Sequence, residues 1–158
     1  GDRTTVILGA RSKELLILAD ELRAVCTDVE ICTDDGSAGM KGFVTQRLAQ
    51  LIAGDGPGRP DCVIAIGPMA MMRAVAETTR EPKVKTLVSM DPLMVDGTGM
   101  CGGCRVTVGG KAQFACVDGP CFDAHEVDFE VAMRRNKAYV REEKRAMERL
   151  ACLGVCRT

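Results

Sequence analysis

The chain has 158 residues, of which 46% are hydrophobic and 27% are charged, and its formal net charge is −1. This composition is typical of a soluble globular protein and excludes a disordered chain, while the balanced charge gives no overall field that favours nucleic acid or anionic lipid. The longest apolar stretch, from Cys62 to Met72, is too short to span a bilayer. We therefore expect no nucleic acid and no membrane among its partners.

In chain order, residues 1–90 alternate strand-like and helix-like segments. Short β-branched or apolar runs predict buried strands, and apolar residues at helical spacing predict helices. The expected strands are 4–8, 29–32, 62–66 and 85–89, and the expected helices are 13–23 with Ser12 as its N-cap, 43–53, and a helix that opens at Gly67-Pro68 and runs to Thr78. The alternation predicts an α/β fold with a doubly wound parallel sheet.

The sequence changes character after Met90. Seven glycines and four cysteines crowd residues 91–126, where 105–108 and 111–114 predict a β-hairpin with a Gly-Gly turn. A highly charged segment then predicts a helix over 127–150, whose charges are expected to form a solvated face. The expected organisation is a partial nucleotide-binding domain at 1–90, a small glycine-rich cluster domain at 91–126, and a C-terminal helical segment at 127–158.

The nine cysteines are many for a chain of this length. Because no signal peptide is recognisable, we expect a reducing, cytoplasmic location in which clustered cysteines bind metal instead of forming disulfides. Cys26, Cys32 and Cys62 lie in or beside predicted strands and helices, and we expect them to be core residues. The single histidine, His125, argues against a His-rich metal site and against a Ser–His–Asp triad.

The strongest pattern is Asp96-x4-Cys101-x2-Cys104-x11-Cys116. Plant-type [2Fe–2S] ferredoxins space their ligands as C-x4-C-x2-C…C within a glycine-rich loop. A carboxylate can ligate iron with the same formal charge as a thiolate, and glycines let backbone N–H groups approach the sulfur atoms. These four residues are therefore predicted to hold a [2Fe–2S] cluster. A structural zinc site on the three cysteines and Cys121 is the alternative, and it would make the chain a zinc-stabilised interaction module.

The run from Ser89 to Arg145, with MDPLMVDGTGMCGGCRVTV and FACVDGP, resembles the small (alpha) subunit of NADH-dependent reduced ferredoxin:NADP oxidoreductases, also called sulfide dehydrogenase alpha subunits. These proteins are related to the electron-transfer subunit of dihydroorotate dehydrogenase, within the ferredoxin–NADP reductase superfamily. The dihydroorotate relatives use four cysteines, so Asp96 favours the former branch. A dihydroorotate-type electron-transfer subunit is the second alternative.

The resemblance also implies a nucleotide site in the first half of the chain. The matching segments are Gly9-Ala10-Arg11-Ser12, Thr33-Asp34-Asp35-Gly36-Ser37 and Gly67-Pro68 with the residues that follow. Such loops lie at the carboxyl ends of parallel strands, where open α/β sheets bind ligands. Asp34 or Asp35 could accept hydrogen bonds from ribose hydroxyls, which would favour NAD(H) over NADP(H). An ordinary turn explains the Thr-Asp-Asp-Gly-Ser run equally well.

Two features of the resembling family are missing from the sequence: the flavin-binding β-barrel, and the first strand with its glycine-rich pyrophosphate turn. In the family's strand order, 3-2-1-4-5, that strand is the central one. The fold expected here is therefore a partial sheet. Either its second and fourth strands pair directly, or a second copy or another strand-completing chain fills the gap.

For an intact protein, the resemblance implies hydride transfer from NADH to FAD, and then transfer of single electrons through the cluster to a glutamate-synthase-like flavoprotein subunit. No side chain is needed as acid, base or nucleophile, because the cofactors supply the chemistry. The chain by itself is not expected to oxidise NADH.

Overall fold

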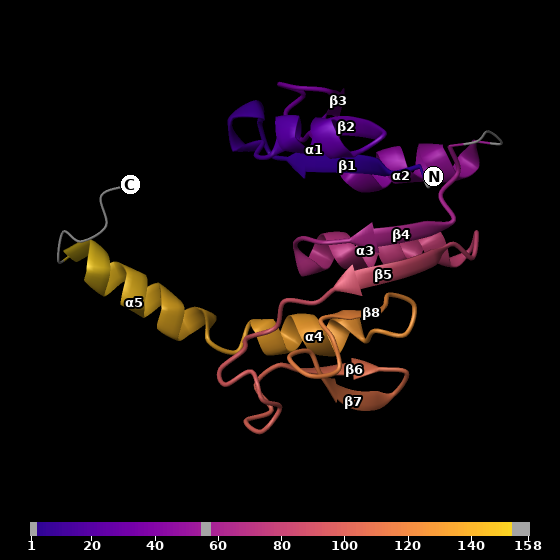
Figure 1. Cartoon of the computed structure of the whole chain (residues 1–158). Coiled ribbons are helices and arrows are strands. Elements are labelled where there is room, and N and C mark those ends of the chain that lie inside the picture. Colours follow the sequence, from indigo (N-terminus) through magenta and orange to yellow (C-terminus); the bar gives the residue numbers. More distant parts are fainter. Residues whose placement is uncertain (1–2, 55–57, 153–158) are drawn as a thin grey trace. The chain divides into compact units, whose positions relative to one another are not determined.

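The computed structural model describes residues 3–54 and 58–152 (Figure 1). By its internal contacts the chain divides into two compact units. The first contains the residues up to 63 together with 74–85, and the second contains 64–73 and the residues from 86 onward. The predicted boundaries at 90 and 126 stay predictions, and the last six residues of the predicted C-terminal segment lie outside the described part.

The first unit contains a parallel sheet in the order β1-β2-β3. Strands β1 (Thr5–Ala10) and β2 (Asp28–Thr33) pair in register along their whole length, from Thr5 opposite Asp28 to Ala10 opposite Thr33. The short β3 (Met40–Lys41), which the sequence did not predict, adds to the other side of β2. The two long strands agree with the predicted ones.

The prediction of one helix over 13–23 was wrong. The structure has a 3-10 turn at Lys13–Leu15 and then a separate helix, α1 (Ala19–Val25). Leu18 stands between them in the left-handed region, with φ of 58°, and the Ser12 side chain makes no capping hydrogen bond. A left-handed residue interrupts the right-handed helix, so the apolar spacing of this segment does not produce a continuous one.

Helix α2 (Val44–Ala53) agrees with the predicted helix. Its first turn is fixed by the Gln46 side chain, whose Oε1 accepts the Phe43 N–H at 3.1 Å. Arg47 on the same helix forms an ion pair with Glu30 of β2, which ties the helix to the sheet. Leu48 is the buried residue of this helix.

A second sheet has the order β4-β5-β8, from β4 (Cys62–Ala65), β5 (Lys85–Ser89) and β8 (Cys121–Asp123). The first two agree with predicted strands and run in the same direction (Figure 1). The sequence did not predict β8, which pairs antiparallel with β5. Helix α3 (Met69–Arg80) connects β4 to β5 and agrees with the predicted helix.

The predicted hairpin is present: β6 (Arg105–Val108) and β7 (Lys111–Phe114) pair antiparallel around Gly109-Gly110. Both glycines have positive φ, as a tight two-residue turn requires. The C-terminal segment is two helices where one was predicted, α4 (Phe129–Asn136) and α5 (Val140–Cys152). The break between them lies at 137–139.

The architecture is mixed α/β, as predicted, but the described strands form two three-stranded sheets and no continuous doubly wound sheet. β1 and β4 do not pair with one another: within the described residues, β1 has β2 as its strand neighbour and β4 has β5. Their predicted burial was wrong. No residue of β1 is buried, and Ile64 is 63% exposed. The completion of these edges by another strand stays a prediction.

Most buried apolar residues of the second unit lie on α3, on β5 and β8, in or beside the hairpin, and on α4. They include Met72, Val88, Val106, Ala115, Phe122 and Phe129. Within the described residues, no helix is long and apolar enough to cross a membrane.

We predict that Met72→Ala lowers the free energy of unfolding by about 2–5 kcal/mol, because it empties space around a fully buried methionine. Met147→Ala is the matched control on an exposed helix position, where the effect should stay within about 0.5 kcal/mol. Urea denaturation followed by circular dichroism measures both values. Equal effects for the two variants would contradict the assigned core.

Candidate metal centre

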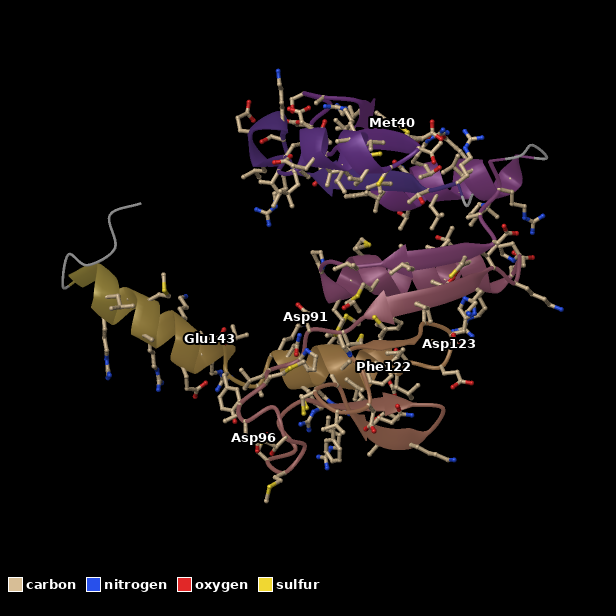
Figure 2. The ribbon with its side chains drawn as sticks, in the orientation of Figure 1. Met40, Asp91, Asp96, Phe122, Asp123 and Glu143 are labelled. Atoms are coloured by element: carbon tan, nitrogen blue, oxygen red, sulfur yellow. The ribbon has the colours of Figure 1, made fainter. Side chains whose placement is uncertain are left out.

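The four predicted metal ligands lie on one loop and on the strand end that faces it. Asp96, Cys101 and Cys104 belong to the long loop between β5 and β6, and Cys116 follows β7. Figure 2 labels Asp96 on this loop. Gly97, Gly99 and Gly102 of this loop all have positive φ. The backbone can follow this path because glycine has no Cβ to clash in the left-handed region.

Cys104 and Cys116 form the inner pair. Cys104 is buried, Cys116 is half-buried, and their Sγ atoms lie 3.2 Å apart. The hairpin sets this geometry, because the Ala115 N–H donates to the Cys104 carbonyl at 3.1 Å. The backbone N–H of Cys116 holds the pKa of the Cys104 thiol below its ordinary value, whereas the Cys104 side chain raises the pKa of Cys116. The pair thus favours one thiolate, which is the form that binds metal.

Asp96 and Cys101 form the outer pair, and both are exposed. The Asp96 carboxylate accepts the N–H of Thr98 at 2.9 Å and the N–H of Cys101 at 3.0 Å. The Thr98 N–H is the main reason that the pKa of Asp96 lies below its ordinary value. The side chain is therefore a carboxylate at neutral pH, as an iron ligand must be.

Two pairs of ligands suit a two-iron cluster, because each iron needs two protein ligands besides the bridging sulfides. The same arrangement suits a single metal ion less well. Residues 3–54 and 58–152 contain no group of three or more His, Cys, Asp or Glu side chains placed to hold one ion. Cys121 of the zinc alternative lies on β8, opposite Ser89 of β5. The donor set and its pairing fit the predicted cluster better than a four-thiolate zinc site.

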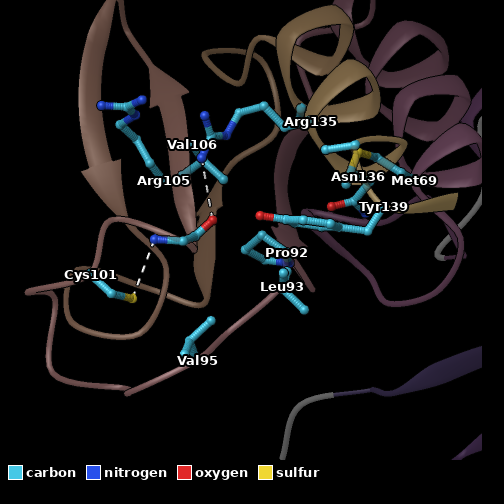
Figure 3. Close-up of a pocket in the computed structure, with 13 residues that line it drawn as sticks. Met69, Pro92, Leu93, Val95, Cys101, Arg105, Val106, Arg135, Asn136 and Tyr139 are labelled. Atoms are coloured by element: carbon cyan, nitrogen blue, oxygen red, sulfur yellow. Dashed lines mark hydrogen bonds between the residues drawn. The ribbon is translucent and has the colours of Figure 1, made fainter. Parts of the chain in front are cut away.

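A cavity of about 330 Å³ adjoins this loop (Figure 3). The loop contributes Leu93, Val95, Cys101 and Gly103, and the end of α4 contributes Ala132 and Arg135. The Arg135 guanidinium donates to the Gly102 and Gly103 carbonyls. The sequence analysis placed Arg135 on a solvated charged face, and this was wrong: the side chain is half-buried against the loop. Its position three residues after Ala132, on an apolar helix face, was the available signal.

Six of the residues predicted to bind nucleotide lie together in the first unit. They follow the carboxyl ends of β1 and β2 and are Gly9, Arg11, Asp34, Asp35, Gly36 and Ser37. The two loops are joined by hydrogen bonds from the Asp34 N–H to the Ala10 carbonyl and from the Lys13 N–H to the Ser37 hydroxyl. Gly67 and Pro68 belong to the second unit, where the Pro68 carbonyl accepts two N–H groups of the first turn of α3.

The two aspartates of this loop differ in their contacts. Asp35 accepts both the N–H of Ser37, at 2.9 Å, and its hydroxyl, at 2.6 Å, so it shapes the turn. Both aspartates are exposed, but Asp35 is engaged by Ser37, so the Asp34 carboxylate is the better candidate for a ribose. Gly9 has a packing role, because a Cβ there would collide with Val44 of α2.

Three cysteines outside the metal centre were predicted to be core residues. Cys32 is buried, as predicted, whereas Cys26 is only half-buried and Cys62 is exposed.

Comparison with known proteins places the metal centre in a described family of domains. Residues 91–128 match the iron–sulfur cluster binding domain of dihydroorotate dehydrogenase B. The chain is 47% identical over 149 residues to a Thermotoga maritima protein named as a dihydroorotate dehydrogenase B (NAD(+)) electron transfer subunit homolog, covering 94% of this chain and 51% of that protein. It is also 47% identical to an uncharacterised protein of Clostridium beijerinckii, over 92% of this chain and 49% of the relative.

A solved structure is also similar to this chain. A chain from the structure of an NADH-dependent reduced ferredoxin-NADP oxidoreductase, described for flavin-based electron bifurcation, superposes with a TM-score of 0.83 at 44% identity. The match covers 96% of this chain and 53% of that one. The chain thus spans about half the length of the relatives it matches.

We predict that mild oxidation of the iron-free chain links Cys104 to Cys116, because their Sγ atoms need to approach by only about 1.2 Å to reach the disulfide length of about 2.05 Å. Peptide mapping by mass spectrometry after diamide treatment identifies the bond. Cys121→Ser should leave it unchanged and Cys104→Ser should abolish it. A dominant bond between other cysteines would contradict the inner pair.

We predict that Ser37→Ala raises the pKa of Asp35 towards its ordinary value of about 3.9, because the Ser37 hydroxyl is the main cause of the lowering. With the lower pKa in the folded state, the carboxylate stabilises the turn fully above the ordinary value, and this stabilisation is lost as the pH falls through the folded-state pKa. Carboxyl NMR titration measures the change. Ser12→Ala should not shift Asp35, and an unshifted Asp35 in Ser37→Ala would disprove the assignment.

Proposed function

We propose that this chain, which is similar to electron-transfer subunits of dihydroorotate dehydrogenase B and to a chain of an NADH-dependent reduced ferredoxin-NADP oxidoreductase, relays electrons within an NAD(P)H-dependent oxidoreductase. The observation that carries the proposal is the arrangement of the four predicted ligands in an inner and an outer pair. Both pairs lie inside residues 91–128, the segment that matches an iron–sulfur cluster binding domain.

We assign a [2Fe–2S] cluster to Asp96, Cys101, Cys104 and Cys116. When bound, such a cluster takes up and releases one electron at a time. The residues of this chain hold it and set its environment. Cys104 and Cys116 provide a partly buried thiolate pair, and Asp96 and Cys101 provide an exposed pair that is linked by a backbone hydrogen bond. No residue acts as acid, base or nucleophile in this proposal.

The nucleotide part of the proposal rests on two loops of the first unit. The loops after β1 and β2 lie at the end of a parallel sheet where α/β folds bind ligands, and their residues join through hydrogen bonds. An exposed Asp34 favours NAD(H), because it would repel the 2′-phosphate of NADP(H). We include FAD as a cofactor of the complete protein, although the chain spans only about half of its relatives.

The partner we propose is a glutamate-synthase-like flavoprotein large subunit, as the sequence resemblance implies. The unpaired edges of β1 and β4 and the exposed Ile64 also leave room for a strand-completing chain or a second copy. A reducing, cytoplasmic compartment suits the site, since Cys101, Cys104, Cys116 and Cys121 are free thiols.

The proposal is tested on chain that is purified anaerobically, with iron, acid-labile sulfide and zinc counted in the same sample as the visible spectrum. A single [2Fe–2S] centre requires a red-brown protein with about two irons and two sulfides per chain. A colourless protein that holds zinc would overturn the proposal and favour the interaction module.

We predict that Asp96→Cys keeps the cluster and shifts its reduction potential, because thiolate and carboxylate carry the same charge but differ as ligands. Cys104→Ser should lose most of the iron, since it removes a ligand from the inner pair, and Cys121→Ser should keep it. Iron counting and a redox titration followed by EPR measure these changes. Loss of all iron in Asp96→Cys would contradict the role of Asp96 as a simple ligand.

A further inference from the structure

Helix α4 is fixed at its start to the hairpin that carries the inner cysteine pair. The Asp128 N–H donates to the Thr107 carbonyl of β6 at 2.9 Å, and the Asp128 side chain caps the helix by accepting the Val131 N–H at 2.9 Å. Val127, just before the helix, forms a β-bridge with Val108. The first turn of α4 is therefore held in place by β6.

The far end of α4 reaches the glycine loop through Arg135. Phe129 and Ala132 are buried, and Arg135 follows Ala132 by three residues, so it lies on the same side of the helix. Its Nη2 atom donates to the Gly102 carbonyl at 3.3 Å and to the Gly103 carbonyl at 3.4 Å. Figure 3 shows the second of these bonds, with the Arg135 side chain extended along the cavity towards the loop.

The contact to the Gly102 carbonyl acts on a peptide group whose other end meets a predicted ligand. The Gly102 carbonyl and the Gly103 N–H belong to the same planar peptide unit and point in opposite directions. The Gly103 nitrogen lies 3.4 Å from the Cys101 Sγ, within reach of an N–H···S hydrogen bond (Figure 3). A cation that holds the oxygen of this unit therefore fixes the direction of its N–H.

We propose that Arg135 is a positioning residue: it holds the Gly102–Gly103 peptide so that its N–H points at the Cys101 sulfur. Gly102 has φ of +67° and cannot fix this orientation by itself, because the glycine backbone is less restricted than that of any other residue type. The guanidinium suits the task, since it stays charged and offers several donors in a rigid plane. The link to a bound cluster rests on the proposed function.

For a chain that carries the cluster, the contact has a predictable electrical effect. Hydrogen bonds to ligand sulfur and nearby positive charge favour the reduced, more negative state, and so raise the reduction potential. Loss of Arg135 removes the charge and releases the N–H. Both changes act in the same direction and lower the potential.

The neighbouring Arg134 provides a matched control. It lies on the same last turn of α4 and carries the same charge, but it is exposed. Arg134→Gln therefore changes the net charge and the helix terminus as Arg135→Gln does, without removing the contact to the loop. Arg135→Lys keeps the charge and the apolar stem but loses the planar group with its several donors.

The experiment uses the full chain, with and without iron. Hydrogen exchange of the Gly102 and Gly103 amides by NMR on the iron-free chain reads the positioning alone, and the midpoint potential of the iron-loaded chain reads its electrical consequence. We expect faster Gly103 exchange and a lower potential in Arg135→Gln, an intermediate result in Arg135→Lys, and wild-type values in Arg134→Gln.

Identical exchange and potential in Arg135→Gln and Arg134→Gln would overturn the inference. An equal drop in potential in both arginine variants would overturn it as well, since it would reduce the effect to net charge. A wild-type chain that binds no iron would refute the proposed function, whereas the Gly103 exchange rates would still decide whether Arg135 positions the loop.

Discussion

A loop that directs backbone N–H groups at sulfur atoms has few side chains that could stabilise its own conformation. The other features of this metal centre follow from that constraint. Between Cys101 and Cys104 there are only glycines. The loop is therefore fixed from outside. The hairpin holds its inner end through the Ala115–Cys104 hydrogen bond and the burial of Cys104, and Arg135 of α4 holds its middle.

The two units differ in how completely they bury their apolar residues. In the second unit, β5 lies between two strands, and Val88 is fully buried. In the first unit, β1 has β2 as its described strand neighbour, and none of its residues is buried although they are mostly apolar. Within the described residues, β1 therefore presents unpaired N–H and carbonyl groups on the side away from β2. The ligand pairs do not depend on this edge, since both lie in the second unit.

The sequence was informative where short-range chemistry decides the structure. The Gly109-Gly110 turn dictates the hairpin, and the hairpin brings the Sγ atoms of Cys104 and Cys116 to a distance of 3.2 Å. Prediction from the sequence failed where a single backbone angle or a contact with a distant residue decides the local structure. Nothing in the apolar spacing of 13–23 shows that Leu18 turns left-handed, and β8 forms only because β5 offers an edge to it. Arg135 was misassigned because charge patterning does not show what a guanidinium touches.

The two ligand pairs also divide the electrostatic task. Cys104 is buried and Cys116 is half-buried, so backbone donors such as the Cys116 N–H are screened less there than at an exposed site. Asp96 and Cys101 are exposed, and water weakens any charge that reaches them only through solvent. A contact through the backbone avoids this loss, because the peptide that Arg135 holds ends 3.4 Å from the Cys101 sulfur. The half-buried arginine can thus influence the exposed thiol from the protected side of the loop, and a charge on the solvent side, such as that of Arg134, cannot do the same.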